Sequence, residues 1–294
     1  GAAALAGAAS LSGASSQPGR MRSIRIAHLT DAHVQPERGA AEGLAACLEH
    51  AQDRYKPDLV VFGGDNVMNV DGASGAERAA QQLGVFNSVV RQHLSTDHLT
   101  VIGNHDILRM QQDAGKRWAM DAFGLSSRYY THDRAGWRII VLDSTEPQEG
   151  GGYKGRLDAE QFQWLAATLA ATPETTPVAV VSHIPIFGAC PFFDGDNEKS
   201  GNWVVPGAWM HLDARAIKDL FRKHPNVKVC LSGHIHLADR VDYLGVTYLC
   251  NGAVSGGWWG GAYQDFGPAY GVVDLYEDGS FGHQLVEYGW KPRQ

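Results

Sequence analysis

The sequence has few cysteines, no long apolar run and no excess of positive charge. Only four cysteines occur among 294 residues, and none forms a Cys-x-x-Cys pair, so a thiolate zinc site is not expected. The sequence contains no run of about 18 strongly apolar residues, so we expect no membrane-spanning helix. The formal net charge is −7 at pH 7, which argues against a basic nucleic-acid footprint and therefore against a stable nucleic-acid partner.

The first 19 residues raise the question of export. They are rich in Ala, Gly and Ser and resemble the apolar core and cleavage region of a bacterial secretion signal without its charged start. We expect an exported or periplasmic protein, with a flexible tail on a cytoplasmic protein as the alternative. The cysteines are expected to be buried free thiols, or to include one disulfide if the protein is exported. They are Cys47, Cys190, Cys230 and Cys250.

Residues 20–294 are predicted to form one α/β domain. Hydrophobic residues make up 44% of the chain, enough for a large core. Short apolar runs alternate with segments of helical spacing, and the C-terminal part changes to strands joined by Gly-bearing turns. Strands are expected over residues 23–29, 58–62, 98–102, 129–131, 137–142, 177–182, 227–231, 240–244, 246–250, 270–276 and 281–288. Helices are expected over residues 40–55, 76–94, 158–171 and 213–223. This order predicts two sheets packed face to face with helices outside.

Residues of the kinds that bind metals follow five of the short apolar strands. They are TDAH (30–33), GGDN (63–66), GNHD (103–106), SH (182–183) and GHIH (233–236). Open α/β sheets place their sites beyond the carboxyl ends of the strands, so we expect the five clusters to converge on one crevice.

The donor types in these clusters indicate which metals would bind. Carboxylates, imidazoles and an amide carbonyl suit Mn, Fe or Zn. There are too many donors for one cation, so two metal ions per chain are expected, and Asp65 is placed to bridge them. Glycines that precede Asp65, Asn104 and His234 would let the backbone turn sharply toward the metals.

The ordered set Asp-x-His, Gly-Asp, Gly-Asn-His-Asp, His and Gly-His-x-His resembles the calcineurin-like metallophosphoesterase superfamily, over residues 31–236. Single blocks occur by chance, whereas the complete ordered set is specific. The resemblance implies a four-layer αββα sandwich of two mixed sheets, which agrees with the predicted elements. It also implies hydrolysis of a phosphoric ester, in which a hydroxide that bridges two cations attacks phosphorus in line.

The resemblance also assigns the site residues. One metal ion is expected on Asp31, His33, Asp65 and His236. The other is expected on Asp65, Asn104, His183 and His234. His105 matches the family's histidine near the leaving group, where it would stabilise charge or donate a proton, with Asp106 beside it to orient the ring.

Spacing within the motifs favours phosphodiesters as substrates. His33 follows Asp31 by two residues, as in class III cyclic-nucleotide phosphodiesterases. Met68 stands where purple acid phosphatases carry an iron-binding tyrosine and where many phosphodiesterase relatives carry an acidic residue. Met68 thus departs from both groups, which bears on the substrate and not on the metal site. The resemblance at Asp31 and His33 makes cyclic nucleotides the leading substrates, with phosphomonoesters or nucleotide-sugar pyrophosphates as the alternative. The non-enzyme alternative is a catalytically inactive protein that binds metal or phosphate, against which the complete ligand set argues.

Two loop segments are candidates for substrate contact. Segment 188–211 is too long for a tight turn and is expected to cap the metal crevice, the alternative being a structural excursion. Segment 251–261 carries a tryptophan pair that would stack on a base, or else contribute to a homo-oligomer contact or to the core. The candidate substrate contacts are Phe192, Phe193, Trp203, His211, Asn251 and Trp258. Packing or surface positions are expected for His28, His50, His93, His98, His132, His224 and His283.

Overall fold

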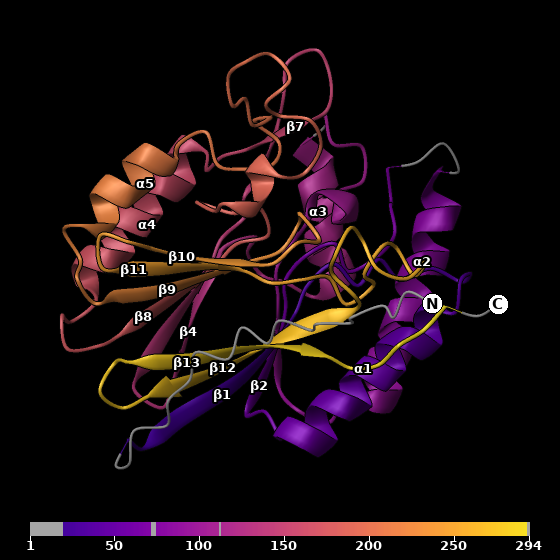
Figure 1. The fold of residues 1–294 in the computed structure, drawn as a ribbon, viewed down its shortest axis with the longest axis horizontal. Helices are drawn as coiled ribbons and strands as arrows, with labels where there is room; N and C mark the ends of the chain where they lie inside the picture. Colours follow the sequence, from indigo (N-terminus) through magenta and orange to yellow (C-terminus); the bar gives the residue numbers. More distant parts are fainter. Residues whose placement is uncertain (1–19, 72–74, 112, 293–294) are drawn as a thin grey trace, which may run out of the picture.

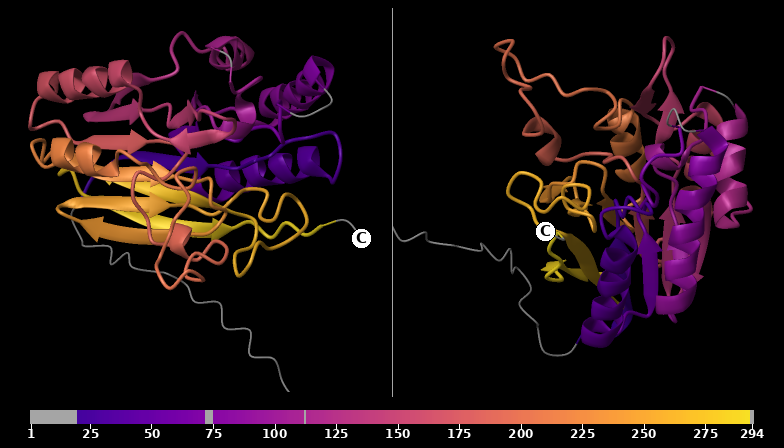
Figure 2. Two further views of the ribbon diagram at one scale, coloured as in Figure 1. Left: turned by 90° about the horizontal axis from the view of Figure 1, so that it is seen from above. Right: turned by 90° about the vertical axis from the view of Figure 1, so that its right-hand side faces the viewer.

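The computed structural model describes residues 20–71, 75–111 and 113–292, and its centre is a pair of β-sheets that face each other (Figures 1 and 2). The first sheet runs, from edge to edge, β13 (Phe281–Glu287), β12 (Ala269–Tyr276), β1 (Arg22–Leu29), β2 (Leu59–Phe62) and β3 (His98–Thr100). The second sheet runs β10 (Asp239–Tyr243), β11 (Val246–Cys250), β9 (Val227–Ser232), β8 (Val178–Val181), β5 (Trp137–Val141) and β4 (Tyr130–Arg134). A separate pair joins β6 (Thr145–Pro147) and β7 (Tyr153–Gly155).

Helices cover the outer faces of both sheets, which confirms the predicted αββα sandwich. The α-helices are α1 (Ala40–Tyr55), α2 (Gly75–His93), α3 (Asp113–Phe123), α4 (Ala159–Ala171) and α5 (Ala214–Phe221). Two short 3-10 helices are η1 (Asn104–Asp106) and η2 (Cys190–Phe192). Buried residues of α1 and α2 pack on the first sheet, and those of α4 and α5 pack on the second.

Alternation along β1 shows how the layers form. Ile24 and Ile26 belong to the core between the sheets, whereas Ala27 and Leu29 belong to the core under α1. Successive side chains of a strand point to opposite faces, so a strand with apolar residues at every position is buried on both. Burying each such aliphatic side chain contributes about 1.5–3 kcal/mol to stability. The short apolar runs in the sequence are therefore the inner strands of the sandwich.

Both sheets are mixed, and their parallel strands carry the metal-type motifs. β1, β2 and β3 are parallel, as are β5, β8, β9 and β11. The other pairings are antiparallel. Because the carboxyl ends of parallel strands open on the same edge of a sheet, the residues that follow β1, β2, β3, β8 and β9 meet at one end of the sandwich.

Every predicted strand and helix has a counterpart, but two features were not predicted. The segment of α3 (Asp113–Phe123) is amphipathic, but it carries an internal glycine and was not assigned to a helix. β6 and β7 have three residues each and no apolar alternation. Both features are held by contacts with the rest of the fold, which a local pattern does not contain.

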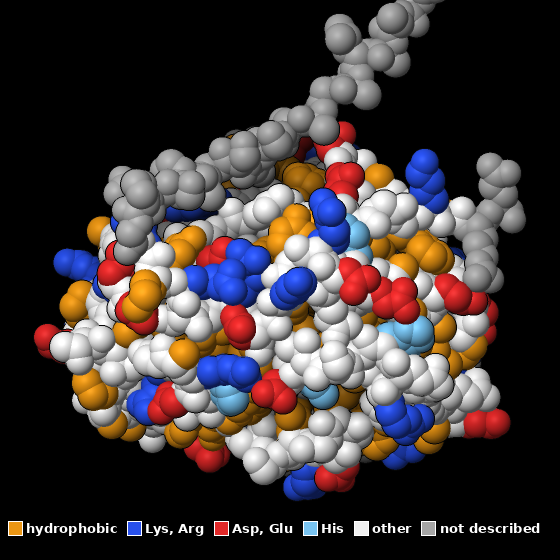
Figure 3. All heavy atoms as spheres, turned by 90° about the horizontal axis from the view of Figure 1, so that it is seen from below, with side chains coloured by type: hydrophobic (Ala, Val, Ile, Leu, Met, Phe, Trp, Pro, Cys, Tyr) orange, Lys and Arg blue, Asp and Glu red, His pale blue; other side chains and the backbone are white. Residues whose placement is uncertain are grey.

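The state of the cysteines and the distribution of surface charge can be compared with what the composition predicts. All four cysteines are buried free thiols, as expected. Within residues 20–71, 75–111 and 113–292, no helix is long and apolar enough to cross a membrane. On the face in Figure 3, acidic and basic side chains are interspersed, so that face carries both signs of charge side by side. Residues 1–19 lie outside the described residues, so export stays a prediction.

A buried polar contact joins the two sheets close to the site. The Asn251 amide donates to Nδ1 of His28 (2.8 Å), and its oxygen accepts from Nε2 of His283 (2.7 Å). Burial lowers the pKa of His28 to about 3 and that of His283 to about 4, so both rings are neutral at pH 7. His28 and His283 belong to the first sheet, whereas Asn251 follows β11 of the second.

Replacing this amide should weaken the fold. Asn251→Leu keeps the side-chain size but leaves two buried imidazoles without a partner, and this should lower the free energy of unfolding by about 1–3 kcal/mol. Gln284→Leu, an exposed change on β13, is the matched control and should stay within about 0.5 kcal/mol of the wild type. Urea unfolding followed by tryptophan fluorescence measures both. Equal losses in the two variants would contradict a linking role for Asn251.

Candidate metal centre

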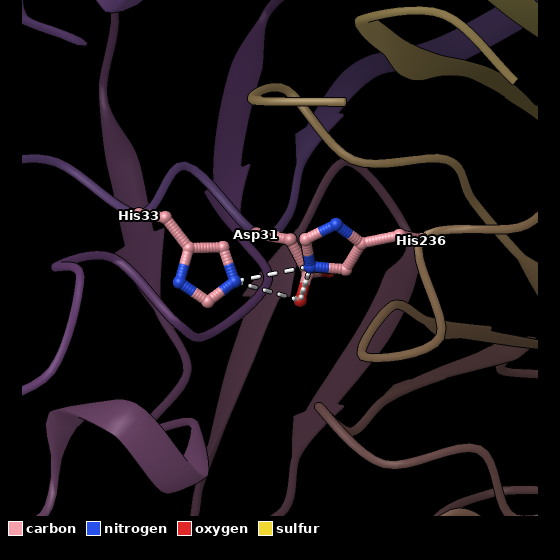
Figure 4. Close-up of side chains that lie close together, drawn as sticks. All are labelled: Asp31, His33 and His236. Carbon is pink, nitrogen blue, oxygen red and sulfur yellow. Dashed lines mark hydrogen bonds and ion pairs between the residues drawn. The ribbon is translucent and has the colours of Figure 1, made fainter. Parts of the chain in front are cut away.

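Three side chains from the two sheets meet at the strand ends (Figure 4). Nε2 of His33 lies 3.0 Å from Nε2 of His236. Oδ1 of Asp31 lies 3.5 Å from Nε2 of His236 and 3.8 Å from Nε2 of His33. All three residues are at most 2% exposed. These donor atoms form one group that could hold a metal ion.

A second group of donor atoms lies beside the first. Nε2 of His183 is 3.2 Å from Oδ2 of Asp65, 3.1 Å from Oδ1 of Asn104 and 3.2 Å from Nδ1 of His234. The same Asp65 oxygen is 3.7 Å from Nε2 of His33, which belongs to the first group. Asp65 is therefore the side chain shared by the two groups.

Hydrogen bonds to the outer atoms of these side chains orient their inner atoms toward the centre. Nδ1 of His236 donates to the Gly256 carbonyl (2.6 Å), and Nδ1 of His183 donates to the Gly63 carbonyl (3.0 Å). An imidazole that donates from Nδ1 has only Nε2 left to offer a lone pair to a metal ion. Oδ2 of Asp31 accepts from the Thr30 hydroxyl (2.6 Å), whereas its buried Oδ1 has no hydrogen-bond partner among the described residues. Such outer contacts are typical of metal ligands, and the orphaned oxygen fits a cation.

Electrostatics in the centre favour a cation. Burial alone would raise the pKa of Asp65, but His183 and its other histidine neighbours hold that pKa well below its usual value. Burial alone would lower the pKa of His183, but Asp65 and Asp31 raise it to about 9. Burial lowers the pKa of His33 and of His234 to about 3, so these two rings are neutral at pH 7 and offer a nitrogen lone pair that could bind a metal ion. The proton on His183 therefore balances part of the negative charge of Asp65 and Asp31. A bound metal ion would balance that charge in its place.

The backbone around the centre is strained. Positive φ angles occur at several of the predicted ligands: Asp31 (56°), His33 (42°), Asp65 (51°), His234 (73°) and His236 (62°). Left-handed backbone is unfavourable for residues with a side chain, and it is found where function imposes it. Two glycines permit close packing here, because a Cβ at Gly103 would lie 2.2 Å from the Asp65 nitrogen and one at Gly233 would lie 1.9 Å from Oγ1 of Thr30.

The ring of His105 borders both donor groups and remains partly accessible. Its Nε2 lies 3.9 Å from Oδ2 of Asp65, and its side chain is 28% exposed. The expectation that Asp106 orients this ring is wrong, because Nδ1 of His105 pairs with the Met68 carbonyl (2.5 Å).

The carboxylate of Asp106 has a different set of partners. Oδ1 accepts from the backbone N–H groups of Asn66 and Val67, and Oδ2 accepts from the Gly103 N–H and the Asn66 amide. Burial and the nearby Asp65 raise its pKa to about 7. Asp106 therefore ties η1 to the loop that carries Asp65, and it supports the centre through the backbone.

Of the six candidate substrate contacts, Trp258 lines the pocket over the centre. Its ring stacks on His236 with centroids 4.4 Å apart. The neighbouring Trp259 is buried against α1 and donates to the His33 carbonyl (3.1 Å), so one tryptophan of the pair belongs to the core.

The other five candidates lie outside the lining of this pocket. Asn251 is fully buried between the sheets. His211 is 3% exposed and pairs with Asp213 (2.9 Å). The rings of Phe192, Phe193 and Trp203 contact one another over a separate surface hollow. The aromatic residues chosen from segment 188–211 were therefore the wrong ones, since Trp209 is the aromatic residue of this segment that lines the pocket.

The pocket has a volume of about 220 Å³, and part of its wall was not predicted. The unexpected lining residues are Tyr153, Asp194, Trp209, Ile235 and Tyr263. Asp194 and Trp209 come from segment 188–211, which extends away from the sheets in Figure 2. Tyr153 begins the short strand β7 and Tyr263 lies in a loop, and an aromatic residue close to several glycines was the available signal for both.

The fold and the carboxylate–histidine centre define a metal-dependent hydrolase, and family comparison agrees. The family model described as calcineurin-like phosphoesterase matches residues 24–238, so the chain belongs to this family. The chain is a phosphoric ester hydrolase, as its family and the names of its relatives support.

Two curated relatives cover most of the chain. The 3′,5′-cyclic adenosine monophosphate phosphodiesterase CpdA of Escherichia coli K12 is 26% identical over 230 residues, which are 76% of this chain and 73% of the relative. A 3′,5′-cyclic-nucleotide phosphodiesterase of Nostoc sp. PCC 7120 is 26% identical over 278 residues, which are 88% of this chain and 90% of the relative. Among solved structures, a dimetal phosphatase from Danio rerio matches with a TM-score of 0.63 and 15% identity, over 92% of this chain and 100% of that one, which shows the shared fold.

Removing the shared carboxylate should affect both metal sites. Asp65→Ala should lower occupancy of two ions, whereas His236→Ala should mainly weaken one, because its nitrogen faces only the first donor group. His224→Ala is the control, since His224 precedes β9 and lies at the opposite end of that strand. Metal analysis of the purified proteins gives the result, and two ions retained in Asp65→Ala would contradict a bridging role.

Proposed function

We propose that the chain hydrolyses phosphodiesters at a centre of two divalent cations, with 3′,5′-cyclic nucleotides as the leading substrates. The observation that carries the proposal is Oδ2 of Asp65, which lies 3.7 Å from Nε2 of His33 in the first donor group and 3.2 Å from Nε2 of His183 in the second. The cyclic-nucleotide phosphodiesterases of Escherichia coli and Nostoc support the substrate class. Phosphomonoesters and nucleotide-sugar pyrophosphates belong in the same substrate panel as competing candidates.

The donor set indicates how the centre would work. Asp31, His33 and His236 would hold one ion, Asn104, His183 and His234 the other, and Asp65 both. Mixed nitrogen and oxygen donors suit Mn, Fe or Zn. Two such ions would polarise the phosphoryl group and supply an activated water. The chain's own contribution is to fix these donors on strained, buried loops, so that little reorganisation is needed when the substrate binds.

His105 is placed to assist the leaving oxygen. Its Nδ1 is engaged by the Met68 carbonyl, so Nε2 is the atom that faces the pocket. When the ring is protonated, Nε2–H can donate to the departing oxygen, and when it is neutral Nε2 can receive a proton back. The ring lies edge-on to His33, with centroids 4.8 Å apart, which sets it beside the first donor group.

The loss of activity on removal of the His105 imidazole should depend on the leaving group of the substrate. A p-nitrophenolate leaves readily without protonation, whereas a ribose alkoxide does not. His105→Ala should therefore reduce kcat/KM for a cyclic nucleotide about 100- to 10,000-fold and reduce it much less for bis-p-nitrophenyl phosphate. Metal content should stay at the wild-type level.

Two other results would change the role of His105. An equal loss on both substrates would indicate charge stabilisation instead of proton donation. Loss of a metal ion would make His105 a ligand, which its place beside His33 and Asp65 allows geometrically. His132→Ala is a control from outside the site, since His132 lies on the edge strand β4.

A further inference from the structure

The pocket over the metal centre has one acidic residue that the metal groups do not use. Asp194 comes from segment 188–211 and lines the pocket together with His33, His105 and Trp258. Its Oδ1 accepts from the Tyr263 hydroxyl (2.7 Å) and from the Gln264 amide (3.2 Å). Among the described residues, these neutral donors are its hydrogen-bond partners, and no lysine, arginine or histidine lies within ion-pair distance.

An acidic wall is unexpected in a pocket that receives a phosphate anion. A carboxylate repels a phosphate anion, and the repulsion grows as the two approach. Asp194 therefore does not serve the phosphate end of the substrate. A carboxylate in this position is instead a strong acceptor for an N–H group, and hydrogen bonds to charged groups are among the strongest in proteins.

The rest of the wall indicates what carries that N–H group. Trp258 is held on one face by His236 and on its edge by Tyr263, whose centroid is 5.2 Å away at an interplanar angle of 80°. Trp209 and Tyr153 add aromatic surface. Aromatic side chains bind planar heterocycles by stacking with little preference among bases. Polar groups placed among the aromatic side chains then determine which base is preferred.

We propose that Asp194 is a specificity-determining residue that accepts a hydrogen bond from the exocyclic amino group of a heteroaromatic base in the substrate. Carboxylate side chains pair with exocyclic amino groups in the same way when proteins read bases. This inference rests on the proposed function for the reaction. It adds a preference for bases that carry an exocyclic amino group. Tyr263 and Gln264 are positioning residues, because they fix Oδ1 and thereby set the direction of the carboxylate.

The sharpest test changes one group on each side of this contact. The substrates are cyclic AMP and the 3′,5′-cyclic phosphate of purine riboside, which lacks only the 6-amino group. The metal-loaded wild type should prefer cyclic AMP by about 10- to 100-fold in kcat/KM. Asp194→Asn keeps an oxygen for Tyr263 but removes the charge, so kcat/KM should fall more for cyclic AMP than for the purine riboside ester, and the preference should fall below about threefold.

A matched control lies two residues away. Asp196 is exposed and pairs with Lys199, so Asp196→Asn removes a charge from the same loop outside the pocket lining. This variant should keep the wild-type preference. Hydrolysis of bis-p-nitrophenyl phosphate should also stay at the wild-type level in Asp196→Asn, because Asp196 lies outside the pocket lining.

Three results would overturn the proposal. They are a wild type without preference for the amino group, an Asp194→Asn variant that retains the preference, and an equal loss on both nucleotides, which would make Asp194 structural. If Asp194→Asn does not fold, Tyr263→Phe serves instead. It keeps the ring and frees the carboxylate, so it should reduce the preference, and a fully retained preference would contradict the role of Asp194.

Failure of the proposed function would look different. The protein would then hydrolyse bis-p-nitrophenyl phosphate but neither cyclic nucleotide. The Asp194 contact is still tested by inhibition of that hydrolysis with AMP and with purine riboside 5′-monophosphate. Stronger inhibition by AMP that disappears in Asp194→Asn would support the contact, and equal inhibition of the wild type would overturn it.

Discussion

Two carboxylates, Asp31 and Asp65, are buried at the end of the sandwich without a lysine or arginine partner among the described residues. Burying a charge is costly unless another charge or a metal ion compensates it. The residues around them are histidines and an asparagine, whose nitrogen and oxygen donors suit a metal cation. Most of the features of this end of the molecule follow from that requirement, including the strained loops, the close glycines and the backbone contacts of Asp106.

The place of the centre could be predicted from the sequence because it depends on local patterns. Each motif directly follows an apolar strand, and parallel strands bring their carboxyl ends together, so Asp31, Asp65, Asn104, His183 and His234 had to lie near one another. The αββα layers followed from the same alternation of strands and helices. The atoms that orient each side chain could not be predicted. They include the backbone carbonyls of Gly63, Gly256 and Met68, and because every residue has such a carbonyl, the sequence does not show which of them contact the site.

The pocket walls were less predictable for a physical reason. Long loops are held by contacts between distant residues, and a loop's sequence does not show which side chains turn inward. In segment 188–211 the conspicuous aromatics Phe193 and Trp203 are 65% and 54% exposed, whereas the less conspicuous Asp194 faces the pocket. Asn251 was misplaced because its partner His28 lies more than two hundred positions earlier in the chain. The rigid centre thus follows from the strands, while substrate choice depends on loops that the fold alone does not determine.

The central claim is that Asp65 joins two cations in one centre. The most direct measurement is an anomalous-scattering map from crystals of the Mn-loaded protein, recorded at the manganese edge. The structure predicts two peaks about 3.5–4 Å apart, with Asp65 in contact with both. A single peak on Asp31, His33 and His236, or two peaks too far apart to share Asp65, would contradict the account.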